Sequence, residues 1–154
     1  MDIIENQAGR ENPRSVITRY NLAASGEKNA DGEKESLFEL IRSAKRSGPA
    51  GKAFDYSSIN TTLLALLAET VENKRWSDIY QERVWSKMTV EGDLQVSIAP
   101  DSTPLPHGLV ASRLRDLARY GMLYTPSWNK AAGERMVLQV YVRQTQPGGR
   151  RIQS

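Results

Sequence analysis

The stretch that decides the fold runs from Gly48 to Leu64 and reads GPAGKAFDYSSINTTLL. A turn is predicted from Pro49 to Lys52, and Ala53 to Tyr56 predicts a short extended approach to the next element. Ser58 stands where a helix N-cap is expected. The apolar residues that follow cover more than one face of a helix: Leu63, Leu64, Ala65, Leu66, Leu67, Ala68 and Val71. We therefore expect a central helix that starts directly after Tyr56.

Further helices are predicted on both sides of this one. Ser36-Leu37-Phe38-Glu39 is a capping-box pattern, and the helix that it opens is expected to stop at Ser47-Gly48-Pro49. A third amphipathic helix is predicted from Trp76 onward, and Ser112 is expected to open a fourth, in which Gly121 suggests close packing. The apolar run over residues 136–142 fits either a helix or a strand.

Little of the chain predicts a β-sheet. Residues 94–98 alternate like a short strand before three prolines break the pattern. Residues 1–34 are polar and irregular, and a short helical turn around Ser15 to Tyr20 is left open. Residues 35–125 hold the predicted helices, and residues 126–154 form an extension with a tail predicted to be disordered. The predicted fold is mainly α, with a core made of Phe38, Ile41, Leu63, Leu64, Leu67, Ile79, Val84, Leu114 and Leu117.

Composition excludes several classes of function. The 154 residues suffice for one domain with a core. With no cysteine and one histidine, the sequence offers no disulfide, thiolate nucleophile or cysteine zinc site, and we expect no metal and no cofactor. The net charge of +3 comes from interspersed charges, which argues against a nucleic-acid partner. No signal peptide or membrane-spanning run is found, so the default prediction is a cytoplasmic protein with no membrane partner.

A second stretch of the sequence allows the first one to be interpreted. Residues 107–121 read HGLVASRLRDLARYG. The first stretch is similar to the turn, Phe-x-Tyr-Ser and leucine-rich helix of the serine β-lactamase-like superfamily. The second resembles that family's Gly-containing segment and its Ser-x-x-Asp-Leu-Ala-Arg-aromatic-Gly helix. The superfamily includes class C β-lactamases, related carboxylesterases, penicillin-binding proteins and 6-aminohexanoate-dimer hydrolases. The resemblance implies the helical subdomain of the β-lactamase/transpeptidase-like α+β fold, with most of the antiparallel sheet missing.

The resemblance also implies a chemistry. The family transfers acyl groups through the serine of a Ser-x-x-Lys motif, whose proton is shared with a lysine and a tyrosine phenol, beside a Lys-Thr-Gly-like strand. Tyr56 matches the tyrosine. A phenol with a pKa of about 10 needs a nearby cation or lysine for this task. Ser58 stands where many members have the Asn of Tyr-x-Asn, and a hydroxyl cannot span two partners as an amide does. Whether Ser58 belongs to the site or only caps the helix is left open.

The other two motifs of the family are not identified. Two literal Ser-x-x-Lys strings exist, Ser25 to Lys28 and Ser127 to Lys130. The family places this motif on a buried helix well before the tyrosine. Ser25 lies in a predicted loop close before Tyr56, and Ser127 follows Tyr56. No Lys-Thr-Gly or His-x-Gly string follows Ser112. Short motifs match often by accident, so neither serine is assigned as the nucleophile.

Other chemically capable residues have simpler interpretations. His107 is expected to be a loop residue rather than a catalytic base. Trp76, Trp85 and Trp128 are expected in the core rather than in a substrate groove. Asp116 fits a first-turn carboxylate that favours the helix N-terminus.

Three functional hypotheses follow. The intact parent is expected to hydrolyse a small-molecule ester or amide by an acyl-serine mechanism, and the present chain is expected to be a fragment of it that is not competent alone. The alternative is a non-enzymatic interaction module that completes its fold with another polypeptide. Because a cut through such a fold exposes apolar surface, self-association is also expected.

Overall fold

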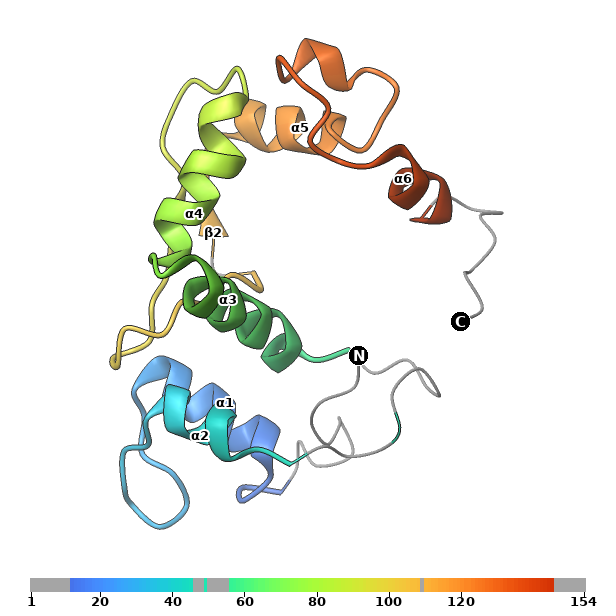
Figure 1. Ribbon diagram of the computed structural model, residues 1–154. Helices are drawn as coiled ribbons and strands as arrows, with labels where there is room; N and C mark the ends of the chain where they lie inside the picture. Colours follow the sequence, from blue (N-terminus) through green and yellow to red (C-terminus); the bar gives the residue numbers. More distant parts are fainter. Residues whose placement is uncertain (1–11, 46–48, 50–55, 109, 146–154) are drawn as a thin grey trace. The chain divides into compact units, whose positions relative to one another are not determined.

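The computed structural model describes residues 12–45, 49, 56–108 and 110–145 (Figure 1). The helices of this part are α1 (Val16–Ser25), α2 (Leu37–Ser43), α3 (Ser58–Glu72), α4 (Trp76–Arg83), α5 (Leu114–Met122) and α6 (Gln139–Thr145), with the 3-10 turns η2 (Trp85–Lys87) and η3 (Trp128–Lys130). The strands β1 (Gln95–Val96) and β2 (Val110–Ala111) pair in a two-stranded sheet. The described chain is therefore mainly α, as predicted.

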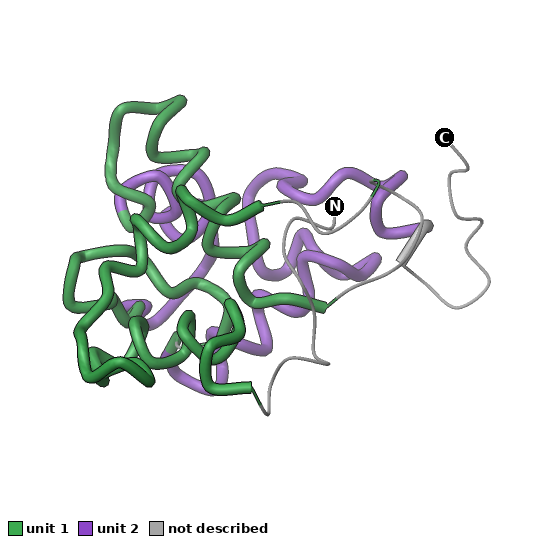
Figure 2. Tube along the Cα trace, turned by 90° about the horizontal axis from the view of Figure 1, so that it is seen from below, with its two compact units in different colours: residues 1–77, 96–110 green, residues 78–95, 111–154 purple. Residues whose placement is uncertain are grey.

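The chain divides into two compact units (Figure 2). Unit 1 comprises residues 1–77 and 96–110, and unit 2 comprises residues 78–95 and 111–154. Each unit has its own cluster of buried apolar side chains. The units do not coincide with the predicted segments 1–34, 35–125 and 126–154, and that division stays a prediction.

The core of unit 1 is built largely by α1 and α2, which lie side by side (Figure 1). Helix α1 begins where a short helical turn was left open, but it runs on to Ser25, into a stretch that was expected to be a loop. Its Ser15 side chain accepts a hydrogen bond from Thr18 N, and Gly26 ends it with φ 75° beside Pro100. An isolated helix of this length is marginal in water. It forms here because one face is buried, in a cluster of Ile17, Tyr20, Ala23, Leu37, Leu40, Ile41, Ile59, Ala99 and Leu105.

The predicted cap of α2 is confirmed. The Ser36 hydroxyl accepts a hydrogen bond from Glu39 N at 3.2 Å. It also donates to Asp101 Oδ2 at 2.8 Å, and the same oxygen accepts from Phe38 N at 2.9 Å. Burial would raise the pKa of Asp101, but these bonds and those from Thr103 outweigh it and lower the pKa. Asp101 therefore ties the start of α2 to the 96–110 segment of unit 1.

Unit 2 packs around one tryptophan. Trp85 is buried and donates from Nε1 to the carbonyl of Gly92 at 2.9 Å. Leu123, Ala131 and Ala132 complete the cluster with Met88. Helix α5 contacts η3 within this unit. The indole thereby satisfies its only donor while its ring fills the core.

The predicted core is correct only in part. Ile41 and Ile79 are buried, and Leu63 and Val84 are half-buried. Five predicted core residues are instead exposed: Phe38, Leu64, Leu67, Leu114 and Leu117. Helical periodicity shows which residues share a face, but it does not show that another element covers the face.

Three local predictions around α5 and α6 are also resolved. The N-cap of α5 is Arg113 rather than Ser112, and it makes no side-chain cap bond. A Cβ at Gly121 would meet no atom within 4 Å, so the close packing expected there is wrong for the described residues. The apolar run at 136–142 leads into a helix, α6.

Truncating Leu37 should strongly destabilise the protein. Leu37 is fully buried, so Leu37→Ala should lower the free energy of unfolding by about 2–5 kcal/mol. Phe38 is its neighbour in α2 but 45% exposed, so Phe38→Ala is the matched control and should cost less. Urea unfolding measures both. An equal loss in the two variants would contradict the assignment of Leu37 to the core.

Candidate functional site

Tyr56 lies directly before α3 and is 63% exposed. Residues 50–55 of the stretch that predicted this site lie outside the described residues. Ser57 is the N-cap of α3, with φ −144° and ψ 109°, and its side chain makes no cap bond. Ser58 is the first helical residue and is half-buried. The interpretation of Ser58 as the helix cap is therefore wrong by one position, because the extended cap residue is Ser57.

A buried polar cluster lies one helical turn beyond Ser58. Thr62 is fully buried, and its Oγ1 lies 2.7 Å from the Tyr20 hydroxyl and 3.3 Å from His107 Nδ1. The Tyr20 hydroxyl lies 3.1 Å from the same Nδ1, and the two rings meet edge to face. Thr62 also approaches the Ser58 carbonyl at 3.5 Å. We call Tyr20, Thr62 and His107 the Thr62 cluster; it joins α1, α3 and the turn at His107 within unit 1.

Burial sets the electrostatics of this cluster. It raises the pKa of Tyr20, against a smaller opposite effect of the hydrogen bond from Thr62. It lowers the pKa of His107. Both changes favour the neutral forms. His107 is a turn residue, as predicted, but its half-buried ring and its two hydroxyl neighbours were not predicted. Nothing in the sequence signals that residues 20, 62 and 107 meet, because each comes from a different element.

The two Ser-x-x-Lys strings do not form the family's arrangement. Ser25 ends α1 and is exposed, and its hydroxyl lies 3.0 Å from the Asn21 carbonyl. Lys28 lies beyond the helix and pairs with Lys34 in an isolated antiparallel β-bridge. Ser127 precedes the three-residue turn η3. In the described part of the chain, the Tyr56 side chain has no hydrogen bond to either serine.

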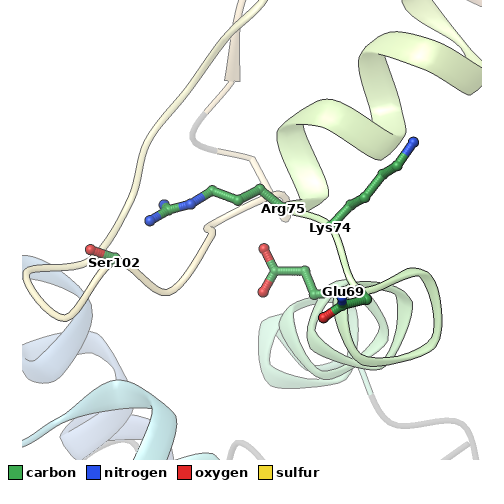
Figure 3. A pocket seen from close by; sticks show the side chains of 5 residues that line it. Glu69, Lys74, Arg75 and Ser102 are labelled. Atoms are coloured by element: carbon green, nitrogen blue, oxygen red, sulfur yellow. The ribbon is translucent and has the colours of Figure 1, made fainter.

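A surface hollow lies at the other end of α3 (Figure 3). It is open, has a volume of about 410 Å³, and is lined by Glu69, Asn73, Lys74, Arg75 and Ser102. The Arg75 side chain extends toward Ser102, and the Glu69 carboxylate accepts a hydrogen bond from Trp76 N at 2.7 Å. A helix of 15 residues is about 22 Å long. The hollow is therefore far from Tyr56 and is no part of its site.

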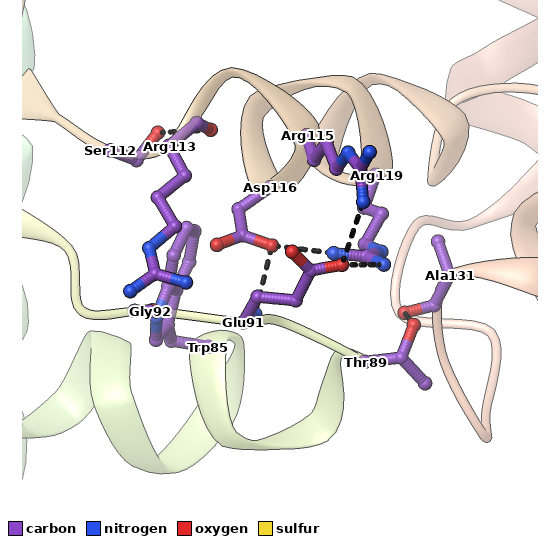
Figure 4. Close-up of polar contacts among 10 residues, drawn as sticks. All are labelled: Trp85, Thr89, Glu91, Gly92, Ser112, Arg113, Arg115, Asp116, Arg119 and Ala131. Atoms are coloured by element: carbon purple, nitrogen blue, oxygen red, sulfur yellow. Dashed lines mark hydrogen bonds and ion pairs between the residues drawn. The ribbon is translucent and has the colours of Figure 1, made fainter.

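The second sequence stretch places a carboxylate inside unit 2 (Figure 4). Asp116 is fully buried, and its Oδ1 accepts from Glu91 N at 2.9 Å and from Arg119 Nη1 at 2.8 Å. Arg119 Nη2 also donates to Glu91 Oε1 at 2.6 Å. Burial would raise the pKa of Asp116, but the Glu91 N–H and Arg119 together lower it. Asp116 lies in the first turn of α5, as expected, but it also holds this helix against Glu91.

The remaining candidates lie outside any catalytic arrangement. Trp85 belongs to the core of unit 2, as expected, whereas Trp76 and Trp128 are half-buried. The Arg135 guanidinium lies 5.0 Å from the ring centre of Trp128. Within the described ranges, no group of three His, Asp or Glu side chains is placed to hold a metal ion. No described helix has the length and apolar character needed to cross a membrane.

The chain belongs to the beta-lactamase family, whose model matches residues 14–151. The chain is 27% identical to the 6-aminohexanoate-dimer hydrolase of Paenarthrobacter ureafaciens over 139 residues; the match covers 90% of this chain and 35% of the hydrolase. It is 27% identical to the unguisins hydrolase ungD' of Aspergillus campestris over 81 residues; this match covers 51% of this chain and 15% of that hydrolase. The resemblance to the serine β-lactamase-like superfamily is therefore confirmed. The chain spans about a third of the first relative and less of the second.

Neutralising Asp116 should destabilise unit 2 in a pH-dependent way. Its pKa lies below the ordinary 3.8, so the carboxylate stabilises the fold above that value and loses this effect as the pH falls through its lowered pKa. Asp116→Asn should therefore lower the urea midpoint at pH 7, and the difference from the unchanged chain should shrink below about pH 4. Asp93→Asn, an exposed carboxylate of the same unit, is the control. Equal pH profiles for all three proteins would contradict the stabilising role.

Proposed function

We propose that this chain is part of a β-lactamase-related serine hydrolase that, when complete, cleaves a small-molecule ester or amide through an acyl-serine. The observation that carries the proposal is the exposed Tyr56 at the start of α3, in a chain that matches the family over residues 14–151. Two relatives named as hydrolases support the same class. Tyr56 is the proposed proton-transfer residue, and Ser58 takes the position of the family's Asn.

The local structure suits Tyr56 for this role. A helix N-terminus carries partial positive charge on its unpaired backbone N–H groups. The Ser57 side chain does not occupy these groups, and Tyr56 lies immediately before them. A lysine of the completed site would take up the serine proton.

The chain alone is proposed to be incompetent. Acyl transfer by this mechanism needs a serine hydroxyl within hydrogen-bond reach of its base. Neither Ser25 nor Ser127 has such a bond with Tyr56 among the described residues. No sequence of the Lys-Thr-Gly type follows Ser112. The serine, the lysine and the third motif are therefore proposed to come from outside these 154 residues, and no metal or cofactor is required.

Ester hydrolysis by the purified chain tests this incompetence. With p-nitrophenyl acetate, we expect no turnover above buffer for the unchanged chain, Tyr56→Phe or Ser25→Ala. A fluorophosphonate probe should leave the intact mass unchanged, because no activated serine is present. Turnover that both substitutions abolish, or one stoichiometric serine adduct, would show a complete serine hydrolase and contradict the proposal.

The role of Tyr56 itself is tested in a chimera. The 139 matched residues of this chain would replace their counterparts in the 6-aminohexanoate-dimer hydrolase, with folding checked by circular dichroism. Tyr56→Phe should lower ester turnover of the chimera about 10²–10⁴-fold, the usual contribution of a proton-transfer group. Tyr141→Phe, an exposed tyrosine of α6, is the matched control and should not. Similar turnover in both variants would remove Tyr56 from the mechanism.

A second candidate function is an interaction module that completes its fold with another polypeptide. The observation that favours it is exposed apolar surface on two helices. On α3, Leu64, Leu67 and Val71 share one face and are 51%, 46% and 81% exposed. On α5, Leu114 and Leu117 are also exposed. An exposed apolar face such as that of α3 is typical of a binding surface or a site of self-association.

Sedimentation velocity distinguishes this candidate from a stable monomer. The purified chain should form concentration-dependent oligomers between about 5 and 200 µM, in the range where modest apolar contacts associate. Leu64→Gln with Leu67→Gln should shift the distribution toward the monomer, while Thr61→Gln, an exposed polar position of the same helix, should not. A single compact monomer at every concentration would argue against both self-association and an interaction module.

A further inference from the structure

Among the described residues, the Thr62 cluster ties the titratable rings of Tyr20 and His107 to α3, the helix that Tyr56 directly precedes. Tyr20 comes from α1 and His107 from the turn after Leu105, and both meet the Thr62 hydroxyl. Thr62 and Ser58 lie one turn apart on the same face, and the Thr62 hydroxyl approaches the Ser58 carbonyl. Thr62 is fully buried and Tyr20 nearly so. The cluster is therefore placed to fix the first turn of α3.

We propose that Tyr20, Thr62 and His107 act as positioning residues that hold the start of α3, and with it Tyr56 and Ser58, and that a proton on His107 loosens this segment. The functional meaning of the proposal rests on the proposed role of Tyr56. The contacts themselves stand without it, and they go beyond the family chemistry because none of the three residues belongs to the serine, tyrosine or Lys-Thr-Gly motifs.

A proton on His107 Nδ1 changes the direction of the hydrogen bonds in the Thr62 cluster. When His107 Nδ1 is bare, it accepts from one hydroxyl, and that hydroxyl accepts from the other. When Nδ1 carries a proton it becomes a donor. The Tyr20 or the Thr62 oxygen then accepts from it, and the two hydroxyl hydrogens point toward Thr62 and the Ser58 carbonyl. The hydrogen bonds can therefore be kept in either state. What differs is a positive charge in a half-buried place.

The surroundings of His107 do not compensate that charge. Tyr20 is the titratable group that faces it from α1, and burial raises the pKa of that phenol, so it stays neutral. Thr62 faces it from α3 and does not titrate. In the described ranges, no carboxylate forms an ion pair with His107, and burial alone lowers the pKa of the imidazole. The open segment therefore binds the proton better than the closed one.

The direction of the pH effect follows from this difference. The imidazole of an opened segment titrates near its ordinary 6.5, and that of the closed segment titrates lower. Above 6.5 both are neutral and the closed state is fully favoured. As the pH falls from 6.5 through the lowered pKa, opening becomes more favourable, and below the lowered pKa the effect is complete. Loosening is thus expected on the acidic side only.

The chain holds one histidine, so a ¹⁵N-labelled imidazole gives one assignable signal in the full-length protein. The titration midpoint should lie below 6.5. A midpoint at or above 6.5 would overturn the proposal.

Amide hydrogen exchange, corrected for the intrinsic pH dependence of exchange, measures how strongly the first turns of α3 are protected against opening. Thr62→Val keeps the shape but removes the hydroxyl, and it should lower protection at the start of α3 about tenfold, as expected for one buried hydrogen bond. Thr62→Ser restores the hydroxyl and should restore most of the protection. His107→Asn keeps an acceptor near the place of Nδ1 but cannot titrate, so its α3 protection should no longer fall between pH 7.5 and 5. Amides of α5, in unit 2, are the internal control.

The outcomes separate positioning from general stability. A positioning role predicts losses confined to the start of α3, whereas a merely structural role predicts equal losses across α1, α2 and α3. Equal losses, or a fall with pH that persists in His107→Asn, would overturn the proposal. None of these readouts needs turnover. If Tyr56→Phe leaves the ester turnover of the chimera unchanged, the proposed role of Tyr56 fails, but the exchange results still test the positioning role. The failures of the two proposals are therefore distinguishable.

Discussion

The buried hydroxyl of Thr62 is the constraint on which the arrangement of unit 1 depends. A polar group without solvent access must find partners inside the protein, because leaving it unpaired costs about 1–3 kcal/mol. Its partners, Tyr20 and His107, come from α1 and from the 96–110 segment, so satisfying one side chain brings three distant parts of the chain together. The same requirement acts on Asp101, which accepts from Ser36 and Phe38 and so fixes α2 to that segment as well. Apolar burial fills the space between the helices, while these polar contacts set which segments meet.

In unit 2, the buried polar group that needs partners inside the protein is the charged carboxylate of Asp116. Helix α5 buries Asp116 and leaves Leu114 and Leu117 exposed, the reverse of the usual amphipathic arrangement. A buried carboxylate is tolerated only when it is paired and hydrogen-bonded, and Arg119 with the Glu91 N–H provides this. Because α5 turns Asp116 toward the interior of unit 2, Leu114 and Leu117 face outward. They are also part of the apolar surface on which the proposed interaction module rests.

The proposed chemistry is distributed unevenly over the family's motifs. Tyr56 is presented at a helix start and Ser58 at the first helical position, whereas no serine and lysine pair joins them in the described residues. In the proposed mechanism, Tyr56 transfers a proton only when another segment provides the nucleophile. The 35% coverage of the 6-aminohexanoate-dimer hydrolase agrees with such a division, because about two-thirds of that enzyme has no counterpart here.

The sequence by itself determined the class of protein and the positions of most helices. Capping at Ser36, the leucine-rich run after Tyr56 and the two motif stretches are local patterns, and each reports on a few neighbouring residues. It did not determine which apolar faces are covered: Leu64 and Leu114 look like core residues by periodicity but are exposed. It indicated no more than a short turn where α1 forms, because the propensity of this segment is too weak without tertiary packing. The meeting of Tyr20, Thr62 and His107 and the burial of Asp116 were decided by tertiary structure alone, because contacts between residues far apart in the chain leave no periodic signal in the sequence.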